Sequence, residues 1–173
     1  MTVLRKDPLL VGSLRYNRLT EKIDVTKVLW WNKEPCVLTN KGRKALRYFF
    51  EKYYGLFNES VMDDALDLEA YSKEYHPICE YLETLEWDGK ERIRNVLKVY
   101  MGADDSDMVY EMLKHFMMGA LNRIYCPGCK FDEMLCLVGQ QGAGKSTFFR
   151  FLALDDQWFS DSLKNLNMEK PYE

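Results

Sequence analysis

The chain has 173 residues, of which 47% are hydrophobic and 29% charged, and its formal net charge is -3 at pH 7. This size and composition exclude a disordered tail and allow one globular domain, or a small domain followed by part of a second. The sequence has no apolar run of about eighteen residues and no apolar stretch at its N-terminus, so we expect a cytoplasmic protein without a secretory leader or a membrane partner.

Charge is distributed unevenly along the chain. Residues 1–57 carry twelve Lys and Arg against five Asp and Glu, whereas residues 58–88 carry one Lys against ten acids. A basic N-terminal surface could therefore meet a polyanion, although the net negative charge gives no support for indiscriminate nucleic-acid binding.

A short β-hairpin is predicted near the N-terminus. Residues 14–18 and the alternating pair Ile23 and Val25 flank a turn at residues 19–21, as two antiparallel strands would. Such a hairpin would supply a small sheet for the helices that follow.

Two helices are predicted after the hairpin. Thr39 or Asn40 is placed to cap the first, and Asn58 or Ser60 to cap the second. A hairpin combined with two or three helices predicts a small winged-helix-like region over residues 1–75.

The first of these helices is strongly basic. It carries five basic residues against a single acid, Glu51, and Arg43 and Arg47 lie one helical turn apart. The candidate DNA contacts on this helix are Lys41, Arg43, Lys44 and Arg47. The alternative is an ordinary solvated basic face that keeps the protein soluble.

A helical linker region is predicted over residues 76–130. A short helix follows Pro77, and another spans roughly residues 92–100. The clearest helix covers residues 107–125, because Ser106 can cap it and apolar side chains fill a broad stripe along it. We expect that stripe to form core.

A turn and an apolar run follow this helix. Residues 126–129 read Cys-Pro-Gly-Cys, and residues 133–138 form a continuous apolar run typical of a strand buried on both faces. Two cysteines could suggest a metal site, but a metal needs two further ligands and His115 is the nearest histidine. A Pro-Gly turn with reduced thiols explains the same residues.

Residues 139–146, Gly-Gln-Gln-Gly-Ala-Gly-Lys-Ser, fit the phosphate-binding pattern G-x-x-x-x-G-K-[ST] and lie between the apolar run and a predicted helix at residues 147–154. The glycines would let backbone amides converge on phosphate oxygens, and the helix would add its positive end. Lys145 would place a charge beside the β and γ phosphates, and Ser146 would ligate Mg²⁺. The predicted ATP-binding residues are Gly139, Gln140, Gln141, Gly142, Ala143, Gly144, Lys145, Ser146 and Thr147.

ATP hydrolysis would also require an acid at the end of a second strand, to hold Mg²⁺ and position the attacking water. No apolar strand ending in Asp or Glu follows the loop, and Asp155, Asp156, Asp161 and Glu169 are better explained as solvated loop acids. We identify no catalytic residue. Residues 131–173 are expected to form a truncated P-loop NTPase segment that is not active alone.

Several blocks of the sequence resemble the virulence-associated protein E family of phages and mobile elements. They comprise residues 75–90, the Pro-Gly-Cys-Lys-Phe-Asp run at 127–132, the glycine-rich loop, and residues 158–163, with weaker similarity in Tyr16-Asn17 and residues 53–56. The resemblance covers most of the chain, and the loop and residues 127–132 are its most specific parts.

The resemblance implies a replication-associated P-loop ATPase, helicase-like or primase-associated, in the cytoplasm of a bacterial host. It assigns ATP and Mg²⁺ binding to the loop glycines, Lys145 and Ser146, and it implies DNA as a partner and a homo-oligomer for the full-length protein. Members of this family continue into a second acidic strand, so we expect the present chain to be a fragment or a truncated gene product.

The sequence thus predicts an α/β protein, mostly helical, in which a hairpin-plus-helices region precedes helices and the first strand, loop and helix of an incomplete P-loop NTPase domain. Our first hypothesis is the N-terminal part of an ATPase that acts in phage or mobile-element DNA replication. The alternative is a non-catalytic DNA- or protein-binding module with a vestigial or truncated P-loop. A nucleotide kinase would need arginine-bearing lid segments, which are not evident.

Overall fold

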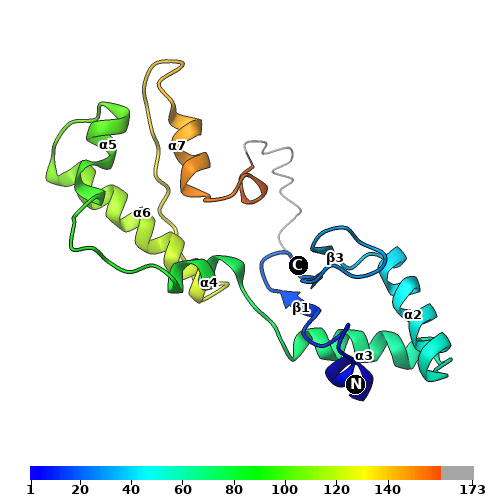
Figure 1. Ribbon diagram of the computed structural model, residues 1–173. Coiled ribbons are helices and arrows are strands. Elements are labelled where there is room, and N and C mark those ends of the chain that lie inside the picture. The colour runs from blue at the N-terminus through cyan, green and yellow to red at the C-terminus, as the bar shows by residue number, and fades with distance from the viewer. Residues whose placement is uncertain (161–173) are drawn as a thin grey trace, which may run out of the picture. The chain divides into compact units, whose positions relative to one another are not determined.

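The computed structural model describes residues 1–160, and the chain divides into two compact units, Met1–Glu86 and a second unit that begins at Trp87 (Figure 1). The described residues contain seven α-helices, one short 3-10 helix and three strands, which confirms the prediction of a mostly helical α/β chain. None of these helices is long and apolar enough to cross a membrane.

A three-stranded antiparallel sheet lies in the first unit. Its strands are β1 (Leu14–Asn17), β2 (Lys22–Val25) and β3 (Cys36–Val37), with β2 in the centre. The Asn17 side chain forms the turn of the hairpin by accepting hydrogen bonds from the backbone amides of Leu19 and Thr20. The predicted hairpin is therefore confirmed, whereas β3 was not predicted.

Four helices complete the first unit: α1 (Thr2–Lys6), α2 (Asn40–Tyr54), α3 (Glu59–Tyr71) and α4 (Pro77–Glu83). The side chain of Thr39 caps α2, and that of Asn58 caps α3 by accepting a 3.1 Å hydrogen bond from the Val61 amide. Both caps are among those that the sequence predicted. They fix where each helix begins.

The core of the first unit lies between the sheet and helices α1, α2 and α3. Its fully buried side chains include Val25 from β2, Leu46 from α2 and Leu66 from α3. The complete buried cluster is Leu4, Leu10, Leu14, Ile23, Val25, Leu29, Leu46, Phe49, Phe50, Met62, Leu66 and Ala70. Burial of this apolar surface is the main driving force for folding of the unit.

One carboxylate, that of Glu69 on α3, is buried beside this core. It accepts a 2.7 Å hydrogen bond from Arg5 of α1 and lies 2.6 Å from the ammonium of Lys73. Burial alone would raise the pKa of Glu69, but the hydrogen bonds from Lys73 and Arg5 outweigh it and hold the pKa below its ordinary value. The charged pair therefore fastens α1 to α3.

A second polar contact joins the hairpin to the chain that follows α3. The Tyr75 hydroxyl donates a 2.6 Å hydrogen bond to Asp24, which also accepts one of 2.8 Å from the buried Asn17 side chain. Burial and the contact with Asp24 raise the pKa of Tyr75 to about 12, so this phenol remains a donor at neutral pH.

The second unit is built mainly from α5 (Ile93–Met101), α6 (Asp107–Tyr125) and α7 (Lys145–Leu152), followed by the 3-10 turn η1 (Asp156–Trp158). Ser106 caps α6, and the bounds of this helix agree with the prediction. One buried residue from each α-helix, Leu97, Leu113 and Phe148, forms the centre of a second apolar cluster. The predicted core stripe of α6 is thus only partly buried.

Residues 133–138 are extended but belong to no strand, so the prediction of a strand buried on both faces is wrong. Leu135 and Leu137 pack against the second cluster, whereas the alternating residues Met134 and Val138 are 81% and 97% exposed. Within the described residues no strand of this unit pairs with the segment, and only one of its two sides packs against other residues of the unit.

Phe131 packs directly on α6 at Gly119. A β-carbon at Gly119 would lie 2.2 Å from Phe131 Cζ, which is far inside contact distance. The Arg123 guanidinium holds the same segment, because it donates a 2.8 Å hydrogen bond to the carbonyl of Phe131. A glycine at position 119 is therefore a requirement of packing.

We predict that Glu69→Gln destabilises the first unit by about 1–2 kcal/mol at neutral pH, since it removes the carboxylate charge that pairs with Arg5 and Lys73. The pKa of Glu69 is lowered in the folded state, so its contribution is complete above the ordinary value of 4.5 and is lost as the pH falls through the folded value. Urea unfolding at several pH values should show a gap between wild type and variant that closes in acid. The exposed Glu74→Gln is the control, and an equal effect there would contradict the assignment.

We predict that Gly119→Ala destabilises the second unit by about 1–2 kcal/mol despite the better helix propensity of Ala, because the methyl group displaces the Phe131 ring. Thermal unfolding measures the loss. In a Phe131→Ala background the ring is gone, and the same substitution should be neutral or stabilising. An equal loss in both backgrounds would show that the ring is not the cause.

Candidate functional site

A glycine-rich loop, residues 139–144, connects the extended segment 133–138 to α7. Gly142 and Gly144 adopt left-handed backbone conformations, with φ of +84° and +78°. Gly144 is the N-cap of α7 and offers no side chain to its first-turn amides. The positive end of α7 therefore faces the loop, an arrangement that suits an anion.

Lys145, the first residue of α7, bends back across the loop. Its ammonium donates hydrogen bonds of 2.9 Å to the Gly139 carbonyl and 2.7 Å to the Gln140 carbonyl. An ammonium has three donors, so one remains for a ligand after these two contacts. The positive charge is thereby held over the loop.

The surface of the loop is open to solvent. Gly144 and Lys145 are half-buried, while the remaining predicted ATP-binding residues are exposed: Gly139, Gln140, Gln141, Gly142, Ala143, Ser146 and Thr147. A cavity of about 270 Å³ lies beside the loop and is lined by Gly139, Ala143 and Lys145 together with apolar residues of the second cluster. The loop residues and the Ser146 side chain are therefore accessible from solvent.

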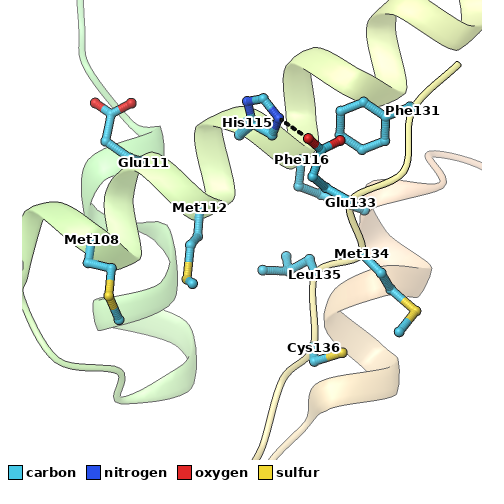
Figure 2. A pocket seen from close by; sticks show the side chains of 10 residues that line it. All are labelled: Met108, Glu111, Met112, His115, Phe116, Phe131, Glu133, Met134, Leu135 and Cys136. Atoms are coloured by element: carbon cyan, nitrogen blue, oxygen red, sulfur yellow. Dashed lines mark ion pairs between the residues drawn. The ribbon is translucent and has the colours of Figure 1, made fainter.

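A larger pocket of about 660 Å³ lies between α6 and residues 131–136 (Figure 2). Met108 and Met112 line it from α6, and Met134 and Leu135 line it from the extended segment. Its polar pair, His115 and Glu133, is 3.5 Å apart and largely exposed. Because this pocket is mainly apolar and contains none of the loop residues, we place the candidate site at the loop.

The acids after α7 have limited freedom to act on a ligand. Arg150 donates two hydrogen bonds, of 2.5 and 2.6 Å, to the carboxylate of Asp156. Hydrogen bonding from Arg150 lowers the pKa of Asp156 below its ordinary value. Sequence reasoning did not find this pair, and Asp161 and Glu169 lie outside the described residues.

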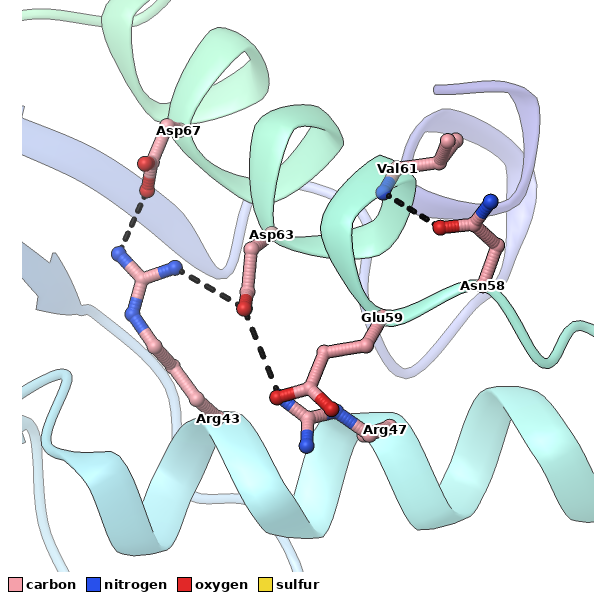
Figure 3. Close-up of polar contacts among 7 residues, drawn as sticks. All are labelled: Arg43, Arg47, Asn58, Glu59, Val61, Asp63 and Asp67. Carbon is pink, nitrogen blue, oxygen red and sulfur yellow. Dashed lines mark hydrogen bonds and ion pairs between the residues drawn. The ribbon is translucent and has the colours of Figure 1, made fainter.

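The predicted DNA-contacting residues of α2 fall into two groups. Arg43 lies 3.3 Å from Asp63 and 2.6 Å from Asp67, and Arg47 lies 2.5 Å from Glu59 (Figure 3). Figure 3 shows both guanidinium groups directed toward the carboxylates of α3. Lys41 and Lys44, by contrast, are exposed. The contrast between a basic stretch and the acidic stretch after it was a sequence signal for this pairing.

The cysteines of the Cys-Pro-Gly-Cys segment form a turn. The Cys129 amide donates a 3.1 Å hydrogen bond to the Cys126 carbonyl, and both thiols are free. Within residues 1–160, no cluster of His, Cys, Asp and Glu side chains is arranged to hold a metal ion. The turn directs the chain toward Phe131 and its contact with α6.

The fold and the loop can now be compared with known families. Residues 82–173 match the family model of the virulence-associated protein E-like domain. The match covers more than half of the chain, so the chain belongs to the virulence-associated protein E family, as its sequence motifs predicted. A comparison with curated proteins gives no match.

We predict that Gly144→Ala weakens binding of magnesium tripolyphosphate to the loop by about tenfold, because a β-carbon disfavours the left-handed conformation. Isothermal titration calorimetry measures the affinity. Gly128→Ala is a matched control, since Gly128 also has a positive φ, of +84°, with no atom within 4 Å of an added β-carbon. Equal losses in both variants would point to general destabilisation instead.

Proposed function

We propose that this chain binds ATP with Mg²⁺ through Gly139–Thr147 and serves as the nucleotide-binding part of a P-loop ATPase, helicase-like or primase-associated, in phage or mobile-element DNA replication. The observation that carries the proposal is the meeting of three features at one loop. These are the left-handed glycines, the uncapped N-terminus of α7 and the Lys145 ammonium held across the loop.

Each feature corresponds to one part of a nucleoside triphosphate. Backbone amides at a helix N-terminus bind phosphate oxygens, and an adjacent ammonium neutralises the terminal phosphates. In the proposed complex, the first-turn amides receive the β phosphate and Lys145 contacts the β and γ phosphates. Ser146 contributes its hydroxyl to Mg²⁺, which is itself held mainly by the phosphates.

Binding is proposed for this chain, and hydrolysis by the chain alone is not. An attacking water needs an acid that also fixes the metal. Of the two acids after α7 in the described residues, Asp156 is already held by Arg150. The proposed role of the chain is therefore to bind the nucleotide.

The two units divide the proposed function between them. We assign the first unit as the DNA-proximal, winged-helix-like region and the second as the beginning of the nucleotide domain. DNA is the proposed partner of the first unit, and of the four predicted contact residues of α2 the exposed Lys41 and Lys44 are the ones placed to meet its phosphates. We also propose that the full-length protein forms a homo-oligomer.

A titration of Mg-ATP tests the nucleotide site. Lys145→Ala should lower the affinity at least tenfold, because it removes a charge-assisted contact to phosphate. Lys130→Ala removes the same charge from an exposed residue outside the loop and should leave the affinity unchanged. If wild type and both variants fail to bind ATP, the alternative of a non-catalytic DNA- or protein-binding module replaces this proposal.

A further inference from the structure

Helix α2 has two charged faces with different surroundings. Arg43 and Arg47 are spaced by one turn and are ion-paired with the acids of α3. Lys41, Lys44 and Lys52 take part in no ion pair within residues 1–160 and are exposed. At about 100° per residue, Lys41 and Lys52 lie on the far side of the helix from the arginines, and Lys44 lies at the border between the two faces. The face away from α3 therefore keeps its positive charge.

Exposed aromatic rings lie among these lysines. Tyr48 is 60% exposed and Tyr53 is 62% exposed. The Lys52 ammonium lies 5.6 Å from the centre of the Tyr48 ring and 5.2 Å from that of Tyr53. One cation thus lies between two rings that are largely open to solvent.

A third ring extends this surface beyond the helix. Trp30 is 47% exposed and stacks on Phe49 of α2, with ring centres 4.6 Å apart. Tyr53 contacts the same phenylalanine, at 4.9 Å between ring centres. The buried Phe49 therefore supports two exposed rings. We call the whole surface the lysine–tyrosine face; it comprises Trp30, Lys41, Lys44, Tyr48, Lys52 and Tyr53.

We propose that the lysine–tyrosine face binds single-stranded nucleic acid, with bases stacked on the exposed rings and phosphates beside the lysines. The inference deepens the DNA-binding part of the proposed function by naming the strand state and the residues. It relies on charge complementarity together with exposed π-faces, the combination that non-sequence-specific single-strand binders use.

The rings distinguish a single strand from a duplex. Bases within a duplex are stacked on one another, so they have no free faces for Tyr48, Tyr53 or Trp30. Lysines alone would serve either form, because they contact only phosphates. The three exposed rings would not strengthen binding to a duplex, which is contacted through its phosphates. In a single strand, each ring can stack on an unpaired base.

Binding of a fluorescein-labelled oligo(dT) 20-mer to the whole chain, measured by anisotropy without ATP, tests the proposal. Tyr48→Ala and Tyr53→Ala should each lower the affinity about tenfold, while Tyr48→Phe, which keeps the ring, should retain it. Lys44→Ala should reduce the slope of log affinity against log salt concentration by about one, because one counterion fewer is released on binding. The matched controls Tyr100→Ala and Lys130→Ala replace exposed residues of the second unit and should have no effect.

The proposal is overturned if the wild-type chain does not bind oligo(dT) at 50 mM salt, or if the two Tyr→Ala variants bind as well as wild type. It is also overturned if a duplex of equal length competes as strongly as the single strand, which would indicate phosphate contacts alone. Retention only on phosphatidylserine vesicles would indicate a membrane surface instead. Oligo(dT) binding is measured without ATP and on variants of α2, so failure of the nucleotide site is distinguishable from failure of this face.

Discussion

Packing of Phe148 against Leu97 and Leu113 is the contact on which the candidate site depends. It joins α7 to α5 and α6, and it lies one turn beyond the N-terminus whose amides face the glycine-rich loop. Phe149 adds a second aromatic contact to the same cluster, with its ring centre 5.9 Å from that of Phe116 on α6. The packing holds α7 in place through its side chains, and the first-turn amides of a helix have no acceptor within it.

In the first unit, helix α2 has one face whose charges are paired with α3 and another whose charges are exposed. The acids of α3 form ion pairs with Arg43 and Arg47 and so connect α2 to α3. This leaves the lysines of the opposite side as the cationic surface. The nucleotide proposal and the single-strand proposal therefore rest on separate residues, in separate units, and each stands or falls by itself.

The elements that local chemistry determines were predictable. Thr39, Asn58 and Ser106 cap the helices that follow them, because a short polar side chain satisfies the first amides wherever the chain enters a helix. The structure of segment 133–138 was not predictable in this way, because strand formation depends on a partner strand that the segment's own residues do not specify. At the site, the pattern of residues 139–146 located the loop, but the bend of Lys145 onto the Gly139 and Gln140 carbonyls arises only in three dimensions. The pairing of Arg43 with Asp67 likewise required the fold, although the charge contrast between the two stretches hinted at it.

In the proposed nucleotide site, residues 139–147 receive the phosphates of ATP. The most direct measurement is a titration of the isotope-labelled chain with Mg-ATP, followed by the backbone amide resonances in nuclear magnetic resonance spectra. We expect the largest shifts at the amides from Gly142 to Thr147, and we expect them to saturate together. Shifts confined to the apolar pocket lined by Met108 and Phe116, or no shifts at saturating nucleotide, would contradict it.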